Sequence, residues 1–152
     1  MRRPKALGQT MKASAPKTIL VDTGFWIALL DRRDEHHADA VIRAGQLEVL
    51  GIAMPWPSLY ETLNTRFAKR SAAMEGFRTF LAKPSTVRID DRHYRDEALE
   101  LTFSKAGARS MSLVDWVIRL MLADTNLKID ALWTYNRRDF LDVCQRRGIE
   151  MP

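Results

Sequence analysis

The sequence predicts a single α/β domain built around a mainly parallel sheet of four to five strands. Its 152 residues, of which 46% are hydrophobic and 28% charged, are enough for one substantial core. Residues Thr18 to Val21 are all aliphatic or β-branched, which is typical of a strand buried on both faces of a parallel sheet. Segments of this kind alternate with segments of helical periodicity, and no repeat or low-complexity stretch interrupts them.

The first half of the chain shows clear start and stop signals. Gly45 is a candidate for the left-handed residue that ends a helix, and Pro55 ends an apolar run. Leu59, Leu63 and Phe67 recur at the spacing of one helix face. The elements expected here are a strand (18–21), a short helix (25–30), a helix (36–44), a strand (47–54), a helix from Ser58 to about Lys69 and a helix (72–82).

The second half continues the alternation. Ser112 precedes a strongly apolar segment and is a good helix N-cap, while Gly107 follows a segment of helical character. The expected elements are a strand (86–89), a helix (94–106), a helix from Ser112, a strand (129–134), a short helix (139–145) and an edge strand (149–151).

Three carboxylates, Asp22, Glu61 and Asp115, stand where a strand ends or a helix begins. In parallel α/β sheets the ligand cleft lies beyond the carboxyl ends of the strands, so these acids can converge there. Hard cations such as Mg²⁺ prefer oxygen ligands, and a few carboxylates are enough to bind one. An ordinary alternative exists for two of them, because Ser58-x-x-Glu61 and Ser112-x-x-Asp115 match the helix capping box. Asp22 has no such capping partner, and a carboxylate after a buried strand is costly unless something satisfies it.

Charge and cysteine content limit the class of protein. The net charge of +5 and pI near 9.7 favour polyanionic partners, although part of the excess lies in a basic tail at residues 1–17, which is either disordered or an overlong start. No apolar run approaches the ~20 residues of a membrane span, and the start lacks the apolar centre of a signal peptide. A cytoplasmic protein is therefore expected. Cys144 is expected to be a small apolar filler, and no Cys or His spacing resembles a zinc site.

Five motifs occur in an order that resembles the PIN-domain family, in particular the VapC-like ribonuclease toxins of bacterial toxin–antitoxin pairs. The motifs are Ile19–Trp26, Arg33–Ala38, Ser58–Glu61, Ser112–Asp115 and Thr134–Phe140. The resemblance covers residues 18–152 and implies a three-layer α/β/α domain around the parallel sheet. It also implies hydrolysis of RNA phosphodiester bonds with Mg²⁺ or Mn²⁺, a cognate antitoxin protein and a homodimer.

The same resemblance assigns the catalytic and metal-binding acids. Asp22, Glu61 and Asp115 match the first three acids of the family. The fourth position is held by Asn136, which removes one negative charge, so either Asn136 or Asp139 is expected to complete the site. The ordinary alternative for Asp139 is the N-cap of the helix that follows it.

Basic and aromatic residues near these acids are candidates for RNA contact. Trp56, between two prolines, is the tryptophan expected to be exposed for base stacking or partner contact. Arginines that follow the acids are expected to contact flanking phosphates: Arg66, Arg70, Arg137 and Arg138. Two other functions compete. A non-catalytic PIN-like RNA-binding module is favoured by Asn136, whereas a phosphatase with Asp22 as nucleophile is disfavoured because Gly24 stands where a second Asp is needed.

Overall fold

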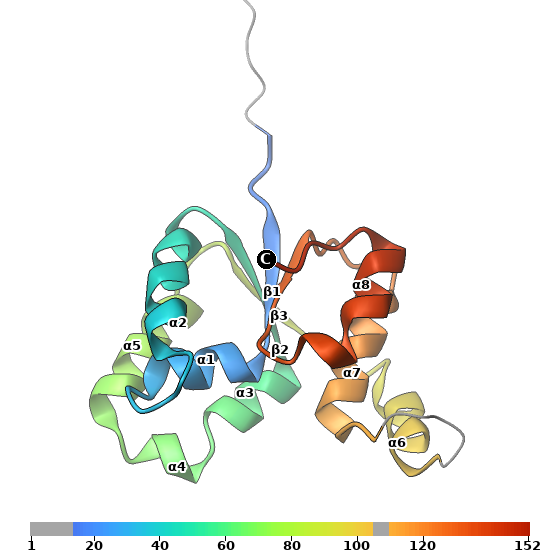
Figure 1. Ribbon diagram of the computed structural model, residues 1–152, viewed down its shortest axis with the longest axis horizontal. Helices are drawn as coiled ribbons and strands as arrows, with labels where there is room; N and C mark the ends of the chain where they lie inside the picture. Colours follow the sequence, from blue (N-terminus) through green and yellow to red (C-terminus); the bar gives the residue numbers. More distant parts are fainter. Residues whose placement is uncertain (1–13, 105–109) are drawn as a thin grey trace, which may run out of the picture.

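The computed structural model describes residues 14–104 and 110–152, apart from the side chains of residues 65 and 66. Four parallel strands form one sheet in the order β3-β2-β1-β4, with helices on both faces (Figure 1). The strands are β1 (Thr18–Val21), β2 (Gly51–Pro55), β3 (Thr86–Ile89) and β4 (Ala131–Trp133). The three-layer α/β/α fold predicted from the sequence is therefore confirmed, while residues 1–13 of the predicted tail lie outside the described residues.

Strand β1 lies in the interior of the sheet and pairs with β2 on one side and β4 on the other. Ile19 lies opposite Ile52 in β2 and Ala131 in β4. Its side chains alternate between two cores, with Ile19 in one and Leu20 in the other. This arrangement explains why the strand is apolar at every position, and it brings the ends of β1 and β4 together.

One face of the sheet is covered by helices from the first half of the chain. They are α1 (Thr23–Leu30), α2 (His37–Ala44), α3 (Trp56–Thr62) and α5 (Ser71–Leu81), with the short α4 (Thr65–Ala68) between the last two. Trp26 of α1 is fully buried, with its ring centroid 5.0 Å from Phe77 and 5.3 Å from Phe80 of α5. Phe77 is buried in this core and Phe80 packs against it.

The other face is covered by α7 (Leu113–Ala123) and α8 (Leu141–Arg147), and α6 (Arg95–Phe103) packs on α7. Arg119 of α7 donates to the Asp142 carboxylate of α8 at 2.7 Å and to the Asp139 carbonyl at 2.9 Å. Gly148, with φ of 66°, ends α8 in the left-handed conformation that favours glycine. Among the described residues, no helix has both the length and the apolar character needed to span a membrane.

Several predicted boundaries were wrong. The predicted strand at 47–54 divides into a 3₁₀ helix, η1 (Gly45–Glu48), and β2, and Gly45 has a right-handed φ of −59°. The predicted helix from Ser58 to Lys69 breaks after Thr62, where the Asn64 side chain donates to the Glu61 carbonyl at 2.8 Å. The expected edge strand at 149–151 forms a single bridge between Glu150 and Ala131, and Gly107 lies outside the described residues.

The buried Cys144 allows a first prediction. Burial, together with the negative charge of Asp142, raises the pKa of its thiol to about 11. The thiolate is the reactive form, so we expect native protein at pH 8 to react with a disulfide reagent far more slowly than protein unfolded in guanidinium. The absorbance of the thiol that the reagent releases would measure both rates. Equal rates in native and unfolded protein would contradict an inert, structural role for Cys144.

Candidate active site

Asp22 directly follows β1 and is the N-cap of α1. Its Oδ1 accepts a hydrogen bond from the Thr23 backbone N–H at 2.8 Å, so the carboxylate satisfies an otherwise unpaired amide of the first helical turn. Its Oδ2 accepts from the Thr134 hydroxyl at 2.8 Å, at the end of the adjacent strand β4. The side chain is buried, with 6% of the residue exposed. Two hydrogen bonds from two elements therefore fix the orientation of this acid.

Glu61 reaches the same end of the sheet from α3. The Thr23 hydroxyl donates to Glu61 Oε2 at 2.6 Å, which joins the start of α1 to α3. The capping interpretation of Glu61 was wrong, because α3 begins at Trp56 and Ser58 lies inside the helix. The Ser58 hydroxyl is buried and has no hydrogen-bond partner among the described residues. Glu61 is thus positioned by Thr23 and not by a helix cap.

Asp115 stands in the first turn of α7. Ser112 is the N-cap of this helix, as predicted, and its hydroxyl accepts from the Asp115 backbone N–H at 3.1 Å. The same hydroxyl lies 2.9 Å from Asp115 Oδ2, to which it donates. The carboxylate is therefore oriented by the serine that caps its helix, and it remains partly exposed.

The charges of Asp115 and Glu61 both act on Asp22. The pKa of Asp22 rises from 3.8 to about 6, chiefly because burial disfavours the charged form. The Thr134 and Thr23 hydrogen bonds lower this pKa, whereas the negative charges of Asp115 and Glu61 raise it. Both acids are therefore close enough to act on Asp22. Their mutual repulsion is the kind that a bound cation relieves.

The donor chemistry of these residues fits a hard divalent cation. Carboxylate oxygens are the ligands that Mg²⁺ and Mn²⁺ prefer, and Mg²⁺ commonly uses one or two carboxylates and keeps several waters. Within the described ranges, no group of three Asp, Glu, His or Cys side chains is arranged to hold a metal ion. A cation at this place would therefore have few protein ligands and would take its other ligands from water.

The two candidates for the fourth position are bonded to each other. The Asn136 side chain donates from Nδ2 to Asp139 Oδ2 at 2.8 Å, and its backbone N–H donates to Thr134 Oγ1 at 3.0 Å. Thr134 in turn bonds Asp22, so a continuous set of hydrogen bonds runs from Asp22 to Asp139. The N-cap interpretation of Asp139 was wrong, since the N-cap of α8 is Phe140 and makes no side-chain cap bond.

Sequence reasoning missed two hydroxyls, those of Thr23 and Thr134. Thr23 directly follows the helix N-cap Asp22, and Thr134 directly follows the last residue of β4. A polar residue at the end of an apolar strand was the signal in the sequence that could have marked them. Parallel strands that are neighbours in the sheet end at the same edge, so a polar residue after β4 meets one after β1. The pairing of β1 with β4 was needed to connect them.

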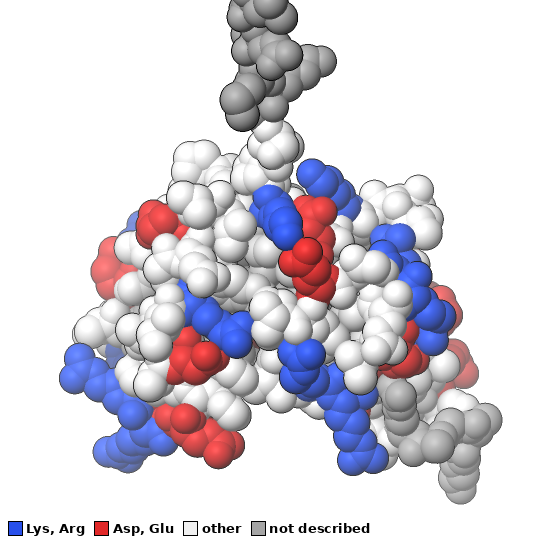
Figure 2. Space-filling model, turned by 45° about the horizontal axis from the view of Figure 1, so that its top comes forward, with Lys and Arg blue, Asp and Glu red and all other residues white. Residues whose placement is uncertain are grey.

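The predicted RNA-contacting arginines are held in different ways. Arg70 lies 3.5 Å from the Asp31 carboxylate, and Arg137 donates to the Met151 carbonyl at 2.6 Å. Arg138 is exposed, and the side chain of Arg66 lies outside the described part. Trp56 is exposed as predicted, with Arg88 over its ring at 5.9 Å. On the face shown in Figure 2, basic side chains lie beside acidic ones, so charge alone does not outline a path for RNA.

Comparison with solved structures finds a likeness over most of the chain. The crystal structure of Mycobacterium tuberculosis VapC20, described as a toxin that cleaves the sarcin-ricin loop, superposes with a TM-score of 0.63. The match covers 82% of this chain and 94% of VapC20, at 20% sequence identity. The chain has the VapC-type PIN fold. No protein-family model and no curated protein sequence matches it. The three-dimensional likeness therefore supports the fold that the sequence resemblance implied. At 20% identity the likeness does not extend to the activity.

Proposed function

We propose that this PIN-fold protein is a metal-dependent endoribonuclease that hydrolyses RNA phosphodiester bonds, and that it is the toxin of a type II toxin–antitoxin pair. The observation that carries the proposal is that Thr23 donates from its backbone N–H to Asp22 and from its hydroxyl to Glu61, which brings these two acids together where β1 ends. The negative charges of Glu61 in α3 and Asp115 in α7 both act on Asp22, the N-cap of α1. A toxin that cleaves the sarcin-ricin loop has the same fold, which supports the substrate class.

The residues that would hold Mg²⁺ or Mn²⁺ are Asp22 and Asp115, and Glu61 is joined to Asp22 through their shared partner Thr23. Such a cation neutralises phosphoryl oxygens and lowers the pKa of a bound water when it is present. Each Asp22 oxygen already accepts one hydrogen bond, and a carboxylate oxygen has a second lone pair for a further partner. Asn136 in the fourth position supplies no charge, so affinity for the cation should be lower than in a site with four acids.

Glu61 is the proposed general base. Thr23 holds its Oε2, which leaves the Oε1 atom to orient the attacking water and to take a proton from it. Asp22 is held by Thr134 and the Thr23 amide, so it keeps its orientation while the substrate binds. The resemblance implies a 5′-phosphate and a 3′-hydroxyl as products, without participation of the ribose 2′-hydroxyl.

A second candidate function is a non-catalytic RNA-binding module. Asn136 favours it, because its side chain donates to Asp139 and adds no negative charge for a cation. This alternative predicts RNA binding without cleavage on every substrate tested.

The test is cleavage of structured RNA by the purified full-length protein in Mn²⁺ or in EDTA. We expect cleavage in Mn²⁺, loss of cleavage in EDTA and its recovery when excess Mn²⁺ is added back. Calorimetric titration with Mn²⁺ alone should show binding that Asp115→Asn weakens. Cleavage that persists in EDTA would exclude the metal-dependent mechanism, and RNA binding without cleavage would favour the binding module. If a small adjacent gene encodes an antitoxin, its product should inhibit the cleavage and co-purify with this protein. The mass of the purified protein and of that complex would show the oligomeric state.

A further inference from the structure

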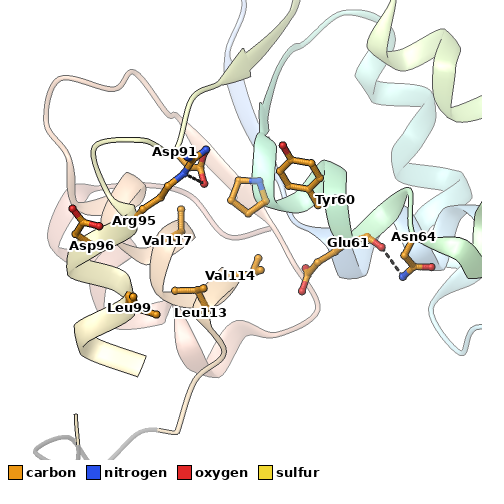
Figure 3. A pocket seen from close by; sticks show the side chains of 11 residues that line it. Tyr60, Glu61, Asn64, Asp91, Arg95, Asp96, Leu99, Leu113, Val114 and Val117 are labelled. Atoms are coloured by element: carbon orange, nitrogen blue, oxygen red, sulfur yellow. Dashed lines mark hydrogen bonds and ion pairs between the residues drawn. The ribbon is translucent and has the colours of Figure 1, made fainter. Parts of the chain in front are cut away.

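A pocket of about 770 Å³ opens beside Glu61, between α3, α6 and α7 (Figure 3). Ligand pockets for molecules the size of a nucleoside typically measure roughly 300–1,000 Å³, so one such molecule fits. Glu61 belongs both to this pocket and to the group of three acids. The pocket therefore shares Glu61 with the candidate active site.

The walls of the pocket suit a flat, largely apolar ligand. Leu99 of α6 and Leu113, Val114 and Val117 of α7 lie across the pocket from Tyr60 of α3 (Figure 3). Tyr60 is 68% exposed, and its ring lies 5.9 Å from the ring of Trp56, which belongs to the same helix. An exposed aromatic ring facing aliphatic side chains is a surface on which a nucleobase stacks, and such stacking tolerates any base.

The charges of the lining favour a base and disfavour a phosphate. Of the residues that line the pocket, Glu61, Asp91 and Asp96 are acidic and Arg95 is basic. Arg95 donates to both oxygens of the buried Asp91, at 3.0 and 2.7 Å, so its charge is already paired. Glu61 is engaged with Thr23 and the attacking water, so Asp96 is the carboxylate that repels a phosphate and accepts a hydrogen bond from an amino group such as those on base edges.

We infer that this pocket is a nucleobase subsite that takes one unstacked base carrying an exocyclic amino group, from a nucleotide next to the bond that is cleaved. The inference rests on the proposed function, since it names the part of the RNA that the site recognises. Single-stranded loops present unstacked bases of this kind, whereas paired bases are not available to such a pocket. The phosphates of that nucleotide stay outside the pocket.

The test measures RNA binding without cleavage, using full-length protein with the Asp22→Asn substitution in EDTA. Fluorescence anisotropy would follow the binding of single-stranded hexamers of A, C or U. We expect the A and C hexamers to bind more tightly than the U hexamer. We further expect Tyr60→Ala to weaken A and C binding by about tenfold, and Tyr60→Phe to retain it. Leu99→Trp, at a position 43% exposed, should fill the pocket and weaken binding similarly.

The matched control is Phe103→Ala, at a 77% exposed position of the same helix as Leu99 and outside the pocket lining. The subsite would be overturned if Phe103→Ala and Tyr60→Ala lowered the affinity for RNA equally. It would also be overturned if the three hexamers bound equally well or if no RNA bound at all. Binding of an arginine-rich peptide that Tyr60→Ala abolishes, with RNA binding unchanged, would overturn it in favour of a protein partner. Failure of the proposed function is distinct: the unsubstituted protein would then bind RNA with this base preference and never cleave it.

Discussion

We expect Asp22→Asn to abolish RNA cleavage and yet to raise the free energy of unfolding at neutral pH in EDTA. Burial and two neighbouring acids raise the pKa of Asp22 from 3.8 to about 6, so ionisation of this group opposes folding. The native state holds the proton more tightly than the unfolded chain does, so stability falls as pH rises from 3.8 to 6. Asparagine keeps the N-cap role and carries no charge. The gain above pH 6 should be up to about 3 kcal/mol, at 1.36 kcal/mol per pKa unit.

Urea unfolding curves from pH 3.5 to 8 would measure this gain. The two proteins should converge as the pH falls below 3.8, where Asp22 becomes protonated in both states, and Mn²⁺ should reduce the difference at neutral pH by stabilising only the unsubstituted protein. Asp39→Asn is a control with the opposite sign. The hydrogen bond from the Tyr135 hydroxyl, and then Arg43, lower the pKa of Asp39, so its removal should destabilise at neutral pH. A stability difference for Asp22→Asn that does not depend on pH would contradict the argument.

The apolar strand Thr18–Val21 shows how much of this fold could be predicted from local sequence. A strand with no polar alternation must be covered on both faces, which requires two helical layers and, with helices between strands, a parallel sheet. The layers and four strands followed from that reasoning. The break between α3 and α4 did not, because the apolar spacing of Leu59, Leu63 and Phe67 continues through it while the Asn64 side chain closes the turn at the Glu61 carbonyl.

The site was predictable to a different degree. Asp22 could be singled out because an acid after a buried strand is costly without a partner. The partners themselves were beyond sequence reasoning, since Thr134 follows Asp22 by 112 residues and their contact depends on which strand lies beside β1. For Glu61, a local capping pattern competed with a tertiary contact, and the contact with Thr23 was the one formed. The pocket beside Glu61 likewise depends on how α6 packs against α7.

We expect Thr23 to be important for turnover because it contacts both Asp22 and Glu61, although no motif marks it as catalytic. Its hydroxyl holds Glu61 Oε2 at 2.6 Å, and its backbone N–H holds Asp22. Thr23→Val has nearly the same shape and keeps the backbone bond, but it releases Glu61. Because misplacement of a reacting group by about 1 Å can cost 10²-fold, we expect kcat to fall by about 10²-fold while KM changes little.

Thr23→Ser is the matched control, since it restores the hydroxyl and should restore most of kcat. Glu61 is only half-buried, so the loss of one hydrogen bond should lower the free energy of unfolding of Thr23→Val by about 1 kcal/mol at most. Steady-state cleavage of a fluorogenic RNA in Mn²⁺, alongside urea unfolding, would separate the two effects. If Thr23→Val and Thr23→Ser turned over at the same rate, Glu61 would not need this anchor, and the role of α1 would be limited to Asp22. A large difference in kcat at equal stability would mean that the contact between α1 and α3 sets the geometry of the reaction.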